Sequence, residues 1–446
     1  MQHGYEELDR AGGFSRVGLL SPLRHRDFRV LWAGMTISLL GDGIFLVAMA
    51  WQVYAISNVP TALSFVGIAM TIPHIAFLLI GGAISDRFDR RLVMLGADAV
   101  RCAAITALAV LSLTGALQLS HMIGLVAVYG AGTAFFGPAF DAIVPDVLPR
   151  ELLAQANSLD QFIRPVALRL AGPAVGGLLI GGIGVGAAFA VNAASFVASA
   201  AALISMRSRP HRPPQGELSL LRDIGEGFAY VRANIWLWGS FLAAAFAYLV
   251  FMGPVEVLLP FMVKNELHGS ATDLGFVFAA GGIGAIGAAA LMGRRRLPRR
   301  TITFVYVVWT LATVALTGYG LAVTTWQLMA ACLAFNALET AGTIVWATMK
   351  QRHVPSHLLG RVSSLDWLIS IGLLPVSFAL TGPAAAAFGT RHTLEFAGIV
   401  GAIITLAPLF LPGMRDIERD HRGQAAAPGD ATGSPSEAAA SASLRS

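Results

Sequence analysis

Long apolar runs separated by short polar segments make up most of the chain. A helix needs roughly 20 apolar residues to cross the hydrocarbon core of a bilayer, which is about 30 Å thick. Twelve runs reach this length, and they occupy residues 28–56, 62–84, 92–115, 120–141, 162–184, 187–206, 235–263, 271–293, 301–322, 326–349, 366–388 and 393–412. The pattern predicts an all-α membrane protein with twelve transmembrane helices.

The polar segments between these runs alternate in charge. Arginine gathers in the N-terminal segment, in every second loop and at the start of the C-terminal tail, whereas the opposite loops hold only Lys264 and Arg391. Basic residues concentrate in the cytoplasmic loops of membrane proteins. Both termini are therefore predicted to be cytoplasmic, which requires an even number of helices.

Composition agrees with a membrane protein and excludes several other classes. Of the 446 residues, 55% are hydrophobic and 13% are charged, whereas an ordinary globular protein has about 25% charged residues. A water-soluble enzyme or a nucleic-acid-binding protein of this size needs a polar surface that such a chain does not supply. Cys102 and Cys332 lie in separate apolar runs without metal-ligand spacing. Without a nucleotide-binding or metal-binding motif, neither a cofactor nor a metal is expected.

One segment occurs twice. PRELLAQANSLD at residues 149–160 aligns with PSHLLGRVSSLD at residues 355–366, and each copy leads into a helix that contains a Gly-Pro pair. Such a repeat predicts two pseudo-symmetric six-helix bundles of the same orientation. The predicted parts are a cytoplasmic N-terminal segment (1–27), a first bundle (28–206), a cytoplasmic loop (207–234), a second bundle (235–412) and a disordered cytoplasmic tail (413–446).

The loop after the second predicted helix contains the sequence GAISDRFDRR. Gly82 is expected to let two helices approach closely, and Asp86 can pair with an arginine or face the N-terminus of another helix. Asp98 and Arg101, three residues apart in the next helix, are expected to form a pair that supports this loop. The residues assigned to gating are Gly82, Asp86, Arg87, Arg90, Arg91, Asp98 and Arg101. The alternative is an ordinary cluster of cytoplasmic arginines.

The fifth predicted helix contains RLAGPAVGG, which begins at Arg169. An arginine inside the membrane needs a partner or a water-filled cavity. Pro173 removes one backbone hydrogen bond and permits a bend, and the glycines of this segment form a flat helix surface. The residues of this segment are Arg169, Gly172, Pro173, Gly176 and Gly177. The alternative is generic close packing of membrane helices.

Acidic residues inside apolar runs are candidates for proton coupling. A charge at the bilayer centre costs about 2.5–3.5 kcal/mol, so it usually faces a cavity and has a function there. The candidates, in order of preference, are Asp42, Glu339 and Glu256; the alternative for Asp42 is a structural hydrogen bond. The residues predicted to line an apolar substrate cavity are Trp51, Phe246, Tyr248, Phe251, Phe335 and Trp346. The alternative for each of them is helix packing or contact with lipid.

These motifs, with the opening at residues 23–45 and the link at 144–160, resemble those of the major facilitator superfamily. Within it, the chain is similar to bacterial exporters of the enterobactin-exporter and macrolide-efflux type over residues 22–412. The resemblance implies alternating access, and it implies that Asp86 braces the start of the eleventh helix, near residues 363–366. The segment at 169–177 resembles the motif of drug/proton antiporters. The arginine motif that the family usually carries in the fourth helix is absent from residues 125–140.

The sequence and the resemblance together predict a transporter and not an enzyme. The expected function is export of an amphipathic small molecule, such as a drug or siderophore, in exchange for protons across the bacterial inner membrane. The expected partners are the substrate, protons and the lipid bilayer, with no nucleic acid, and the chain is expected to act as a monomer. The alternatives are a proton-coupled uptake carrier and a non-transporting receptor on the same fold.

Overall fold

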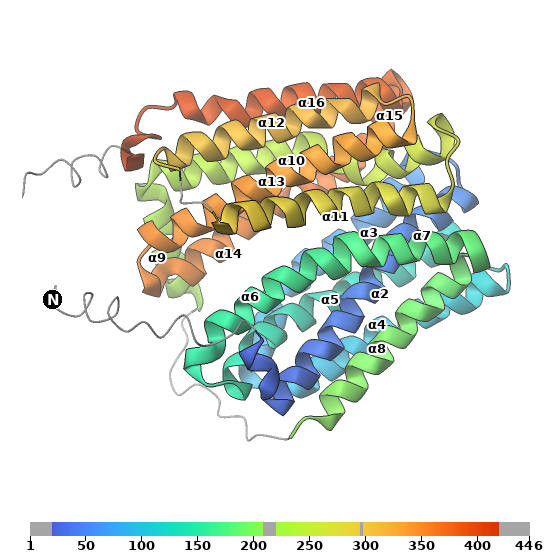
Figure 1. Ribbon diagram of the computed structural model, residues 1–446, viewed down its shortest axis with the longest axis horizontal. Helices are drawn as coiled ribbons and strands as arrows, with labels where there is room; N and C mark the ends of the chain where they lie inside the picture. Colours follow the sequence, from blue (N-terminus) through green and yellow to red (C-terminus); the bar gives the residue numbers. More distant parts are fainter. Residues whose placement is uncertain (1–19, 208–219, 295–297, 419–446) are drawn as a thin grey trace, which may run out of the picture.

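The computed structural model describes residues 20–207, 220–294 and 298–418 (Figure 1). These residues contain 12 helical spans that are long and apolar enough to cross a membrane. The predicted all-α membrane fold with twelve transmembrane helices is confirmed.

The first six spans form one bundle. They are α2 (Arg26–Ile56), α3 (Pro60–Arg87), α4 (Arg90–Leu113), α5 (Leu119–Val147), the continuous run of α6 (Leu153–Arg164), π-helix η3 (Pro165–Ala171) and α7 (Gly172–Ile183), and α8 (Val185–Ser205). Short 3-10 turns, η1 (Ser21–Arg24) and η2 (Arg150–Leu152), precede α2 and α6.

The last six spans form the second bundle. They are α10 (Ile235–Phe261) with π-helix η4 (Met262–Glu266), α11 (Ala271–Arg294), α12 (Thr301–Leu321), α13 (Thr325–His353), α14 (Ser356–Gly372) with α15 (Leu374–Phe388), and α16 (Thr390–Leu406), followed by the 3-10 turn η5 (Ala407–Phe410). A further helix, α9 (Leu220–Ala233), precedes this bundle.

The two bundles pack in the same way. In the first, α2 packs on α8 and α3 on α5; in the second, α10 packs on α16 and α11 on α13. The fifth span of each ends at a glycine with positive φ, Gly184 (φ 96°) and Gly389 (φ 81°), because a left-handed residue closes a helix and only glycine adopts that conformation without strain. The bundles meet through α7 against α11 and through α3 against α15. These repeated contacts give the pseudo-symmetry that the sequence repeat predicts.

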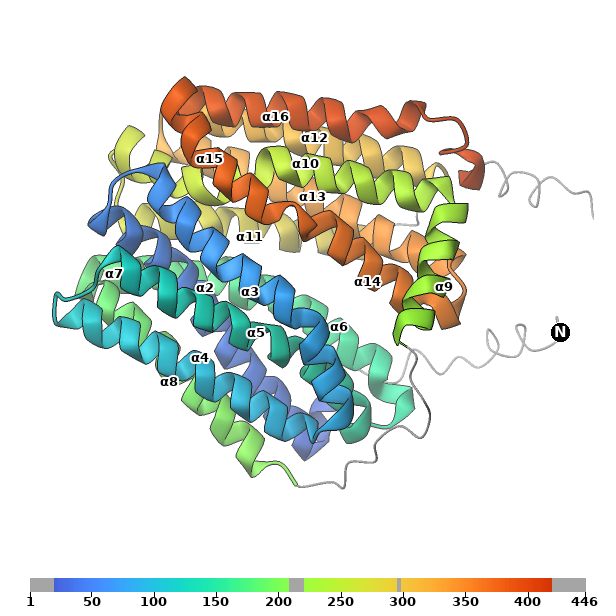
Figure 2. The ribbon, with the colours of Figure 1, turned by 180° about the vertical axis from the view of Figure 1, so that it is seen from behind.

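The bundles diverge from one end of the molecule to the other, as Figures 1 and 2 show from opposite sides. We call the end that holds Ser21 and Glu418 the terminal end, and the opposite end the distal end. One hydrophobic core includes buried residues of both bundles, such as Tyr54 and Val257. Two further cores belong to one bundle each, around Phe28 in the first and Trp236 in the second. The bundles therefore share a core at the distal end and have separate cores at the terminal end.

Four of the predicted segments need correction. The fifth and eleventh spans begin earlier than residues 162 and 366, at Gln155 and Leu358, because the polar segments that precede their apolar runs continue the same helices. The predicted loop 207–234 contains α9. The predicted disordered tail from 413 begins with packed residues: Met414 is fully buried, and Glu418 accepts a 2.7 Å hydrogen bond from the Thr303 backbone. Residues 1–19, 208–219 and 419–446 of the predicted polar segments lie outside the described residues.

Candidate functional site

A group of charged and hydroxyl side chains lies in the middle of the first bundle. Asp42 of α2 accepts a 2.8 Å hydrogen bond from the Tyr129 hydroxyl of α5. On α4, Arg101 forms an ion pair with Asp98 one turn before it, and one of its terminal nitrogens lies 3.9 Å from Asp42 Oδ2. We call Asp42, Asp98, Arg101 and Tyr129 the Asp42 cluster. It joins three helices around one cation and two carboxylates.

Aromatic rings enclose the cation of this cluster. The Arg101 guanidinium carbon lies 4.5 Å from the ring centroids of both Phe136 and Phe196, a distance at which a ring face attracts a cation. Gly132 makes room for the arginine stem, because a Cβ at this position would lie 2.9 Å from Arg101 Cγ. Solvent reaches 3% of the Arg101 side chain and none of Asp98, whereas it reaches 15% of Asp42. Asp42 is therefore the acid of the cluster with access to solvent.

The sequence identified most of this cluster but not its connections. Asp98 and Arg101 form the expected pair, but the pair lies halfway along α4 and contacts Asp42, whereas it was expected to support the loop motif. Tyr129 was not among the candidates. A hydroxyl in the middle of the apolar run at 120–141 was the signal that could have identified it. Arg101 is a buried cation on α4, whereas residues 125–140, where the resemblance implies an arginine, hold none.

The two acids of the second bundle have more open surroundings. Glu256 is exposed although its neighbours Val255 and Val257 are buried, and it lies within electrostatic range of Arg169. Glu339 is half-buried and accepts a 2.9 Å hydrogen bond from the Thr343 hydroxyl on its own helix. The structure thus places the three candidate acids in separate surroundings, and only Asp42 belongs to a network that joins several helices.

Arg169 connects the two bundles. It lies in η3, and its Nη1 donates a 3.1 Å hydrogen bond to Asn336 Oδ1 of α13. Asn336 in turn donates to the Cys332 carbonyl oxygen at 2.9 Å. An arginine in a transmembrane segment needs such a polar partner. Asn336 was not predicted, and an amide in the middle of an apolar run was its signal.

The glycines of the 169–177 segment bring three helices close together. A Cβ at Gly172 would lie 2.7 Å from Gly43 Cα of α2, and a Cβ at Gly176 would lie 3.0 Å from Ile44 Cα. On the other side of the helix, a Cβ at Gly177 would lie 3.0 Å from Gly275 Cα of α11. This surface therefore contacts α2 within its own bundle and α11 of the other bundle.

The loop motif differs in one respect from its expected role. A Cβ at Gly82 would meet no atom within 4 Å, so Gly82 is not a close-approach position in this conformation; Gly81 is one, where a Cβ would lie 2.5 Å from the Ala134 carbonyl oxygen. Arg90 forms a 2.5 Å ion pair with Asp146, and Arg91 donates to the Ile204 carbonyl oxygen at 2.6 Å. These arginines tie the motif to α5 and α8.

The other members of the loop motif make fewer described contacts. Arg87 is exposed at the end of α3. The side chain of Asp86 lies outside the described part of the chain. The expected contact of Asp86 with residues 363–366 therefore stays a prediction. In this segment, Asp366 accepts hydrogen bonds from Lys350 at 2.5 Å and from Trp346 at 3.0 Å.

The predicted cavity walls fall into two groups. Phe251, Phe335 and Trp346 are at most 8% exposed and pack against other rings, with the Phe251 and Phe335 centroids 6.0 Å apart. Phe246 is 50% exposed, and Trp51 and Tyr248 are half-buried. Phe251 and Phe335 belong to the core that both bundles share, and Trp346 belongs to the core of the second bundle.

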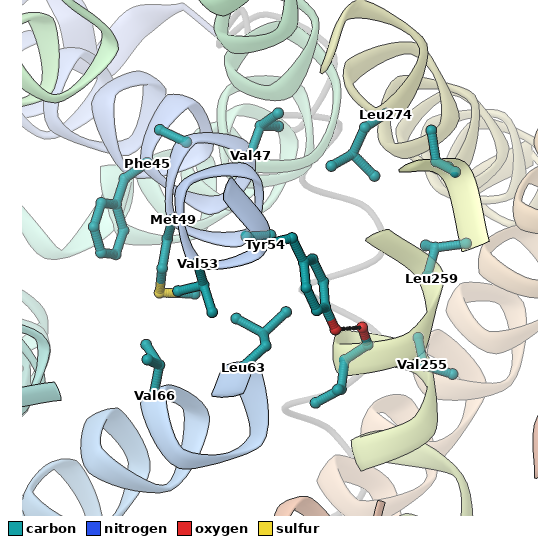
Figure 3. Close-up of a cluster of buried hydrophobic side chains, with 14 of the residues drawn as sticks. Phe45, Val47, Met49, Val53, Tyr54, Leu63, Val66, Val255, Leu259 and Leu274 are labelled. Carbon is teal, nitrogen blue, oxygen red and sulfur yellow. Dashed lines mark hydrogen bonds between the residues drawn. The ribbon is translucent and has the colours of Figure 1, made fainter. Parts of the chain in front are cut away.

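Hydrogen bonds between the bundles gather at the distal end. The Tyr54 hydroxyl donates to the Val257 carbonyl oxygen at 2.6 Å, and Asn58 donates to Asn265 Oδ1 at 2.7 Å. Lys264 donates to the Tyr54 carbonyl oxygen, and its ammonium lies 5.6 Å from the Trp51 ring centroid. Figure 3 shows Tyr54 reaching from α2 to the second bundle beside Val255 and Leu259. Of these residues, only Trp51 was a candidate site residue in the sequence.

Comparisons with known proteins agree with this architecture. The family model of the transmembrane secretion effectors matches residues 17–429. The chain is 23% identical to macrolide efflux protein A of Streptococcus pyogenes over 86% of this chain and 95% of that protein. It is 28% identical to the multidrug efflux pump Tap of Mycolicibacterium fortuitum, with 87% and 96% covered. It is 27% identical to the enterobactin exporter EntS of Escherichia coli O1:K1 / APEC, with 84% and 91% covered.

Solved structures share the fold. A bacterial homologue of the iron transporter ferroportin, in an inward-facing state, matches with a TM-score of 0.64 and 16% identity over 86% of this chain and 99% of that one. A bacterial homologue of the lysosomal transporter Spinster matches with a TM-score of 0.62 and 16% identity over 89% and 98%. The family model spans all of the described residues. The chain is therefore a multi-pass bacterial membrane protein that belongs to the transmembrane secretion effector family of major facilitator superfamily transporters.

Proposed function

We propose that the chain exports an amphipathic small molecule in exchange for protons, that its terminal end faces the cytoplasm, and that Asp42 carries the coupling proton. The relatives named for efflux of macrolides, of several drugs and of enterobactin support the direction and the substrate class. The alternating charge of the loops supports the orientation. The single observation that carries the proposal is the Asp42 cluster, in which a mid-membrane carboxylate lies beside an arginine that another carboxylate already neutralises.

The charges of this cluster suit a group that gains and loses a proton. With Asp42 ionised, two carboxylates accompany one guanidinium, so the cluster carries one net negative charge. A proton on Asp42 makes it neutral, with Arg101 and Asp98 still paired. Burying an uncompensated charge in apolar surroundings is unfavourable in free energy. Proton uptake and release therefore change the free energy of burying the cluster away from water. The solvent access of Asp42 supplies the route for the proton.

The contacts of α2 offer a way for this change to act on the whole molecule. Gly43 follows Asp42 directly and lies against Gly172 in α7. Gly177, on the same helix as Gly172, lies against Gly275 of the second bundle. A small shift of α2 that follows protonation therefore reaches the contact between the bundles, and packed interfaces switch between discrete arrangements.

The arrangement of the bundles corresponds, in this proposal, to the state open toward the cytoplasm. The shared core and the hydrogen bonds of Tyr54 and Asn58 hold the distal end together. Outward opening requires these contacts to break and the separate terminal-end cores to approach each other.

The test uses proteoliposomes with a pH gradient and two probes, a macrolide and the organic cation ethidium. The wild-type protein should accumulate a probe against its concentration gradient. Asp42→Asn should reduce this accumulation at least tenfold and leave probe exchange without a gradient measurable, because binding and the conformational change remain. Asp273→Asn, which removes an acid at the start of α11, is the matched control and should accumulate like the wild type.

Three outcomes contradict parts of the proposal. Full accumulation by Asp42→Asn removes Asp42 from coupling. Loss of accumulation in Glu339→Gln or Glu256→Gln, with Asp42→Asn active, moves the coupling proton to the second bundle. Net movement of both probes in the opposite direction identifies an uptake carrier.

A further inference from the structure

A small cavity lies at the terminal end of the first bundle, between α2, α5 and α6. Its volume is about 200 Å³, and its apolar walls include Phe28, Trp32, Phe140 and Val144. Two carboxylates, Asp141 and Asp160, lie among these rings and aliphatic side chains. An apolar cavity with a few polar groups is the usual form of a small-molecule site. The cavity is separate from the Asp42 cluster, with which it shares no residue.

The carboxylates have unused capacity to accept hydrogen bonds. Asp160 Oδ2 accepts from Arg164 Nε at 2.6 Å, but Asp160 Oδ1 is buried and has no hydrogen-bond partner among the described residues. Asp141 forms no ion pair within 4 Å of a described basic group, and Arg164 acts on it only at longer range. One of the two negative charges is therefore not neutralised by direct contact, and one buried oxygen lacks a donor. A buried carboxylate in this condition favours a cationic donor.

The second bundle shows what occupies the equivalent place there. The sequence repeat relates Asp160 to Asp366, and the same offset relates Phe140 to Trp346 and Val144 to Lys350; α5 and α13 also end at related residues, Val147 and His353. The Lys350 ammonium lies 2.5 Å from Asp366 Oδ2 and 5.6 Å from the Trp346 ring centroid. The second bundle thus places its own alkylammonium on the carboxylate, beside an aromatic ring. In the first bundle a valine takes the place of this lysine. Asp160 pairs instead with Arg164 on its own helix, whose guanidinium carbon lies 5.8 Å from the Phe140 ring centroid, and the cavity lies beside this pair.

We propose that this cavity binds a protonated primary amine on an apolar body, with its ammonium between Asp141 and Asp160. The ammonium takes the place that Lys350 fills in the second bundle, and the apolar body lies among Phe28, Trp32 and Phe140. The site goes beyond the transport function proposed above. Its test measures binding, so a failure of proton coupling and a failure of this site are distinguishable.

The volume sets the size of the ligand. An apolar cavity of about 150 Å³ accommodates benzene, so about 200 Å³ accommodates one aromatic ring and a short aminoethyl chain. The probe is therefore 2-phenylethylammonium, and 2-phenylethanol is its uncharged counterpart.

The experiment is calorimetric titration of the full-length protein in detergent. The wild type should bind one equivalent of 2-phenylethylammonium and bind 2-phenylethanol at least tenfold more weakly. Val144→Lys places a tethered ammonium in the cavity, as Lys350 does in the second bundle, and should abolish binding. Asp141→Asn should weaken binding at least tenfold. Asp146→Asn is the control, because it removes a carboxylate from the same helix that lines no part of the cavity and pairs with Arg90.

The melting temperature of each variant shows whether it folds, and Asp141→Asn keeps the test open where Val144→Lys does not fold. Equal binding of the amine and the alcohol would contradict the proposal, because it indicates an apolar cavity without cation recognition. Unchanged binding in Asp141→Asn would also contradict it, because the amine then binds elsewhere.

The ammonium has two possible sources, a free amine or the headgroup of phosphatidylethanolamine. Titration in phosphatidylglycerol nanodiscs with and without phosphatidylethanolamine separates them. Weaker binding of the probe in the presence of phosphatidylethanolamine supports the site and assigns it to the lipid headgroup. Binding that does not depend on this lipid supports the site and assigns it to a free amine.

Discussion

The two bundles share a backbone arrangement, but their interiors have opposite chemistry. In the middle of the first bundle, Tyr129 donates a hydrogen bond to Asp42 beside the buried Arg101. The repeat relates Tyr129 to Phe335, which has no hydroxyl and packs against the rings of Phe251 and Tyr319. The first bundle is charged where the second is aromatic.

At the terminal end the relation is reversed. In the second bundle the ion pair between Lys350 and Asp366 joins two helices, whereas in the first Asp160 pairs with Arg164 on its own helix and a cavity lies beside it. The two bundles thus share a fold but differ in the polar groups that they bury. The first bundle carries the buried charges on which proton coupling is proposed to depend, and the second carries a self-contained polar contact around which its helices pack. Exchanging residues between related positions therefore tests which differences matter.

The largest effect is expected from Arg101. Arg101→Met leaves Asp98 buried without its partner, and breaking a buried ion pair in this way costs about 3–5 kcal/mol of stability. The measurement is the melting temperature of the purified protein and its yield from membranes. The double variant Arg101→Met/Asp98→Asn should recover much of the loss, because it removes both charges. A single variant as stable as the wild type would contradict the view that this pair holds α4 in place.

The Asp42 cluster also shows which features of a site can be predicted from the sequence. Asp42, Asp98 and Arg101 could be identified because charges inside apolar runs are rare, and the spacing of Asp98 and Arg101 predicted their pair. The position of the Asp98–Arg101 pair beside Asp42 and Tyr129 depends on the depth and rotation of three helices. Periodicity within one helix does not determine either quantity.

The same limit applies elsewhere along the chain. Hydropathy located all twelve spans but began the fifth and eleventh too late, because polar helical turns precede their apolar runs. The expectation for Gly82 followed from residue type alone, and its neighbour Gly81 makes the close contact instead. Which of two adjacent glycines faces another helix is a property of helix packing.

The next largest effect on stability is expected at Tyr129, which differs by one hydroxyl group from its related residue Phe335. Tyr129→Phe gives the first bundle the residue of the second and removes a hydrogen bond to a carboxylate, which contributes about 1.5–3 kcal/mol. The reverse change, Phe335→Tyr, places a hydroxyl among aromatic rings and should cost about 1–3 kcal/mol unless the hydroxyl finds a partner. Thermal unfolding measures both. An unchanged melting temperature in Tyr129→Phe would indicate that water replaces the lost donor.

A similar or smaller effect is expected where helices approach closely. In Gly172→Ala the new methyl group would lie 2.6 Å from the Ala167 carbonyl oxygen and 2.7 Å from Gly43 Cα. Overpacking of this kind costs about 1–3 kcal/mol. Gly82→Ala is the matched control: it adds a methyl group to open space in a helix, so it should be neutral or stabilise by up to about 1 kcal/mol. Loss of transport in Gly82→Ala with unchanged stability would show that Gly82 is a close-approach position in the other conformation.

The smallest effect is expected at the terminal end, where the comparison between related acids is most direct. Asp160 accepts one described hydrogen bond, from Arg164, whose side chain is 39% exposed. Solvent screens such a pair, so Asp160→Asn should cost about 0–1 kcal/mol in the absence of an amine. Asp366 accepts hydrogen bonds from Lys350, Trp346 and Ser370, and Lys350 and Trp346 are buried. Asp366→Asn should therefore lower the melting temperature more than Asp160→Asn does. Equal effects of the two changes would mean that the first bundle stabilises its carboxylate as fully as the second. The contrast between the one described hydrogen bond of Asp160 and the three of Asp366 would then lose its energetic basis.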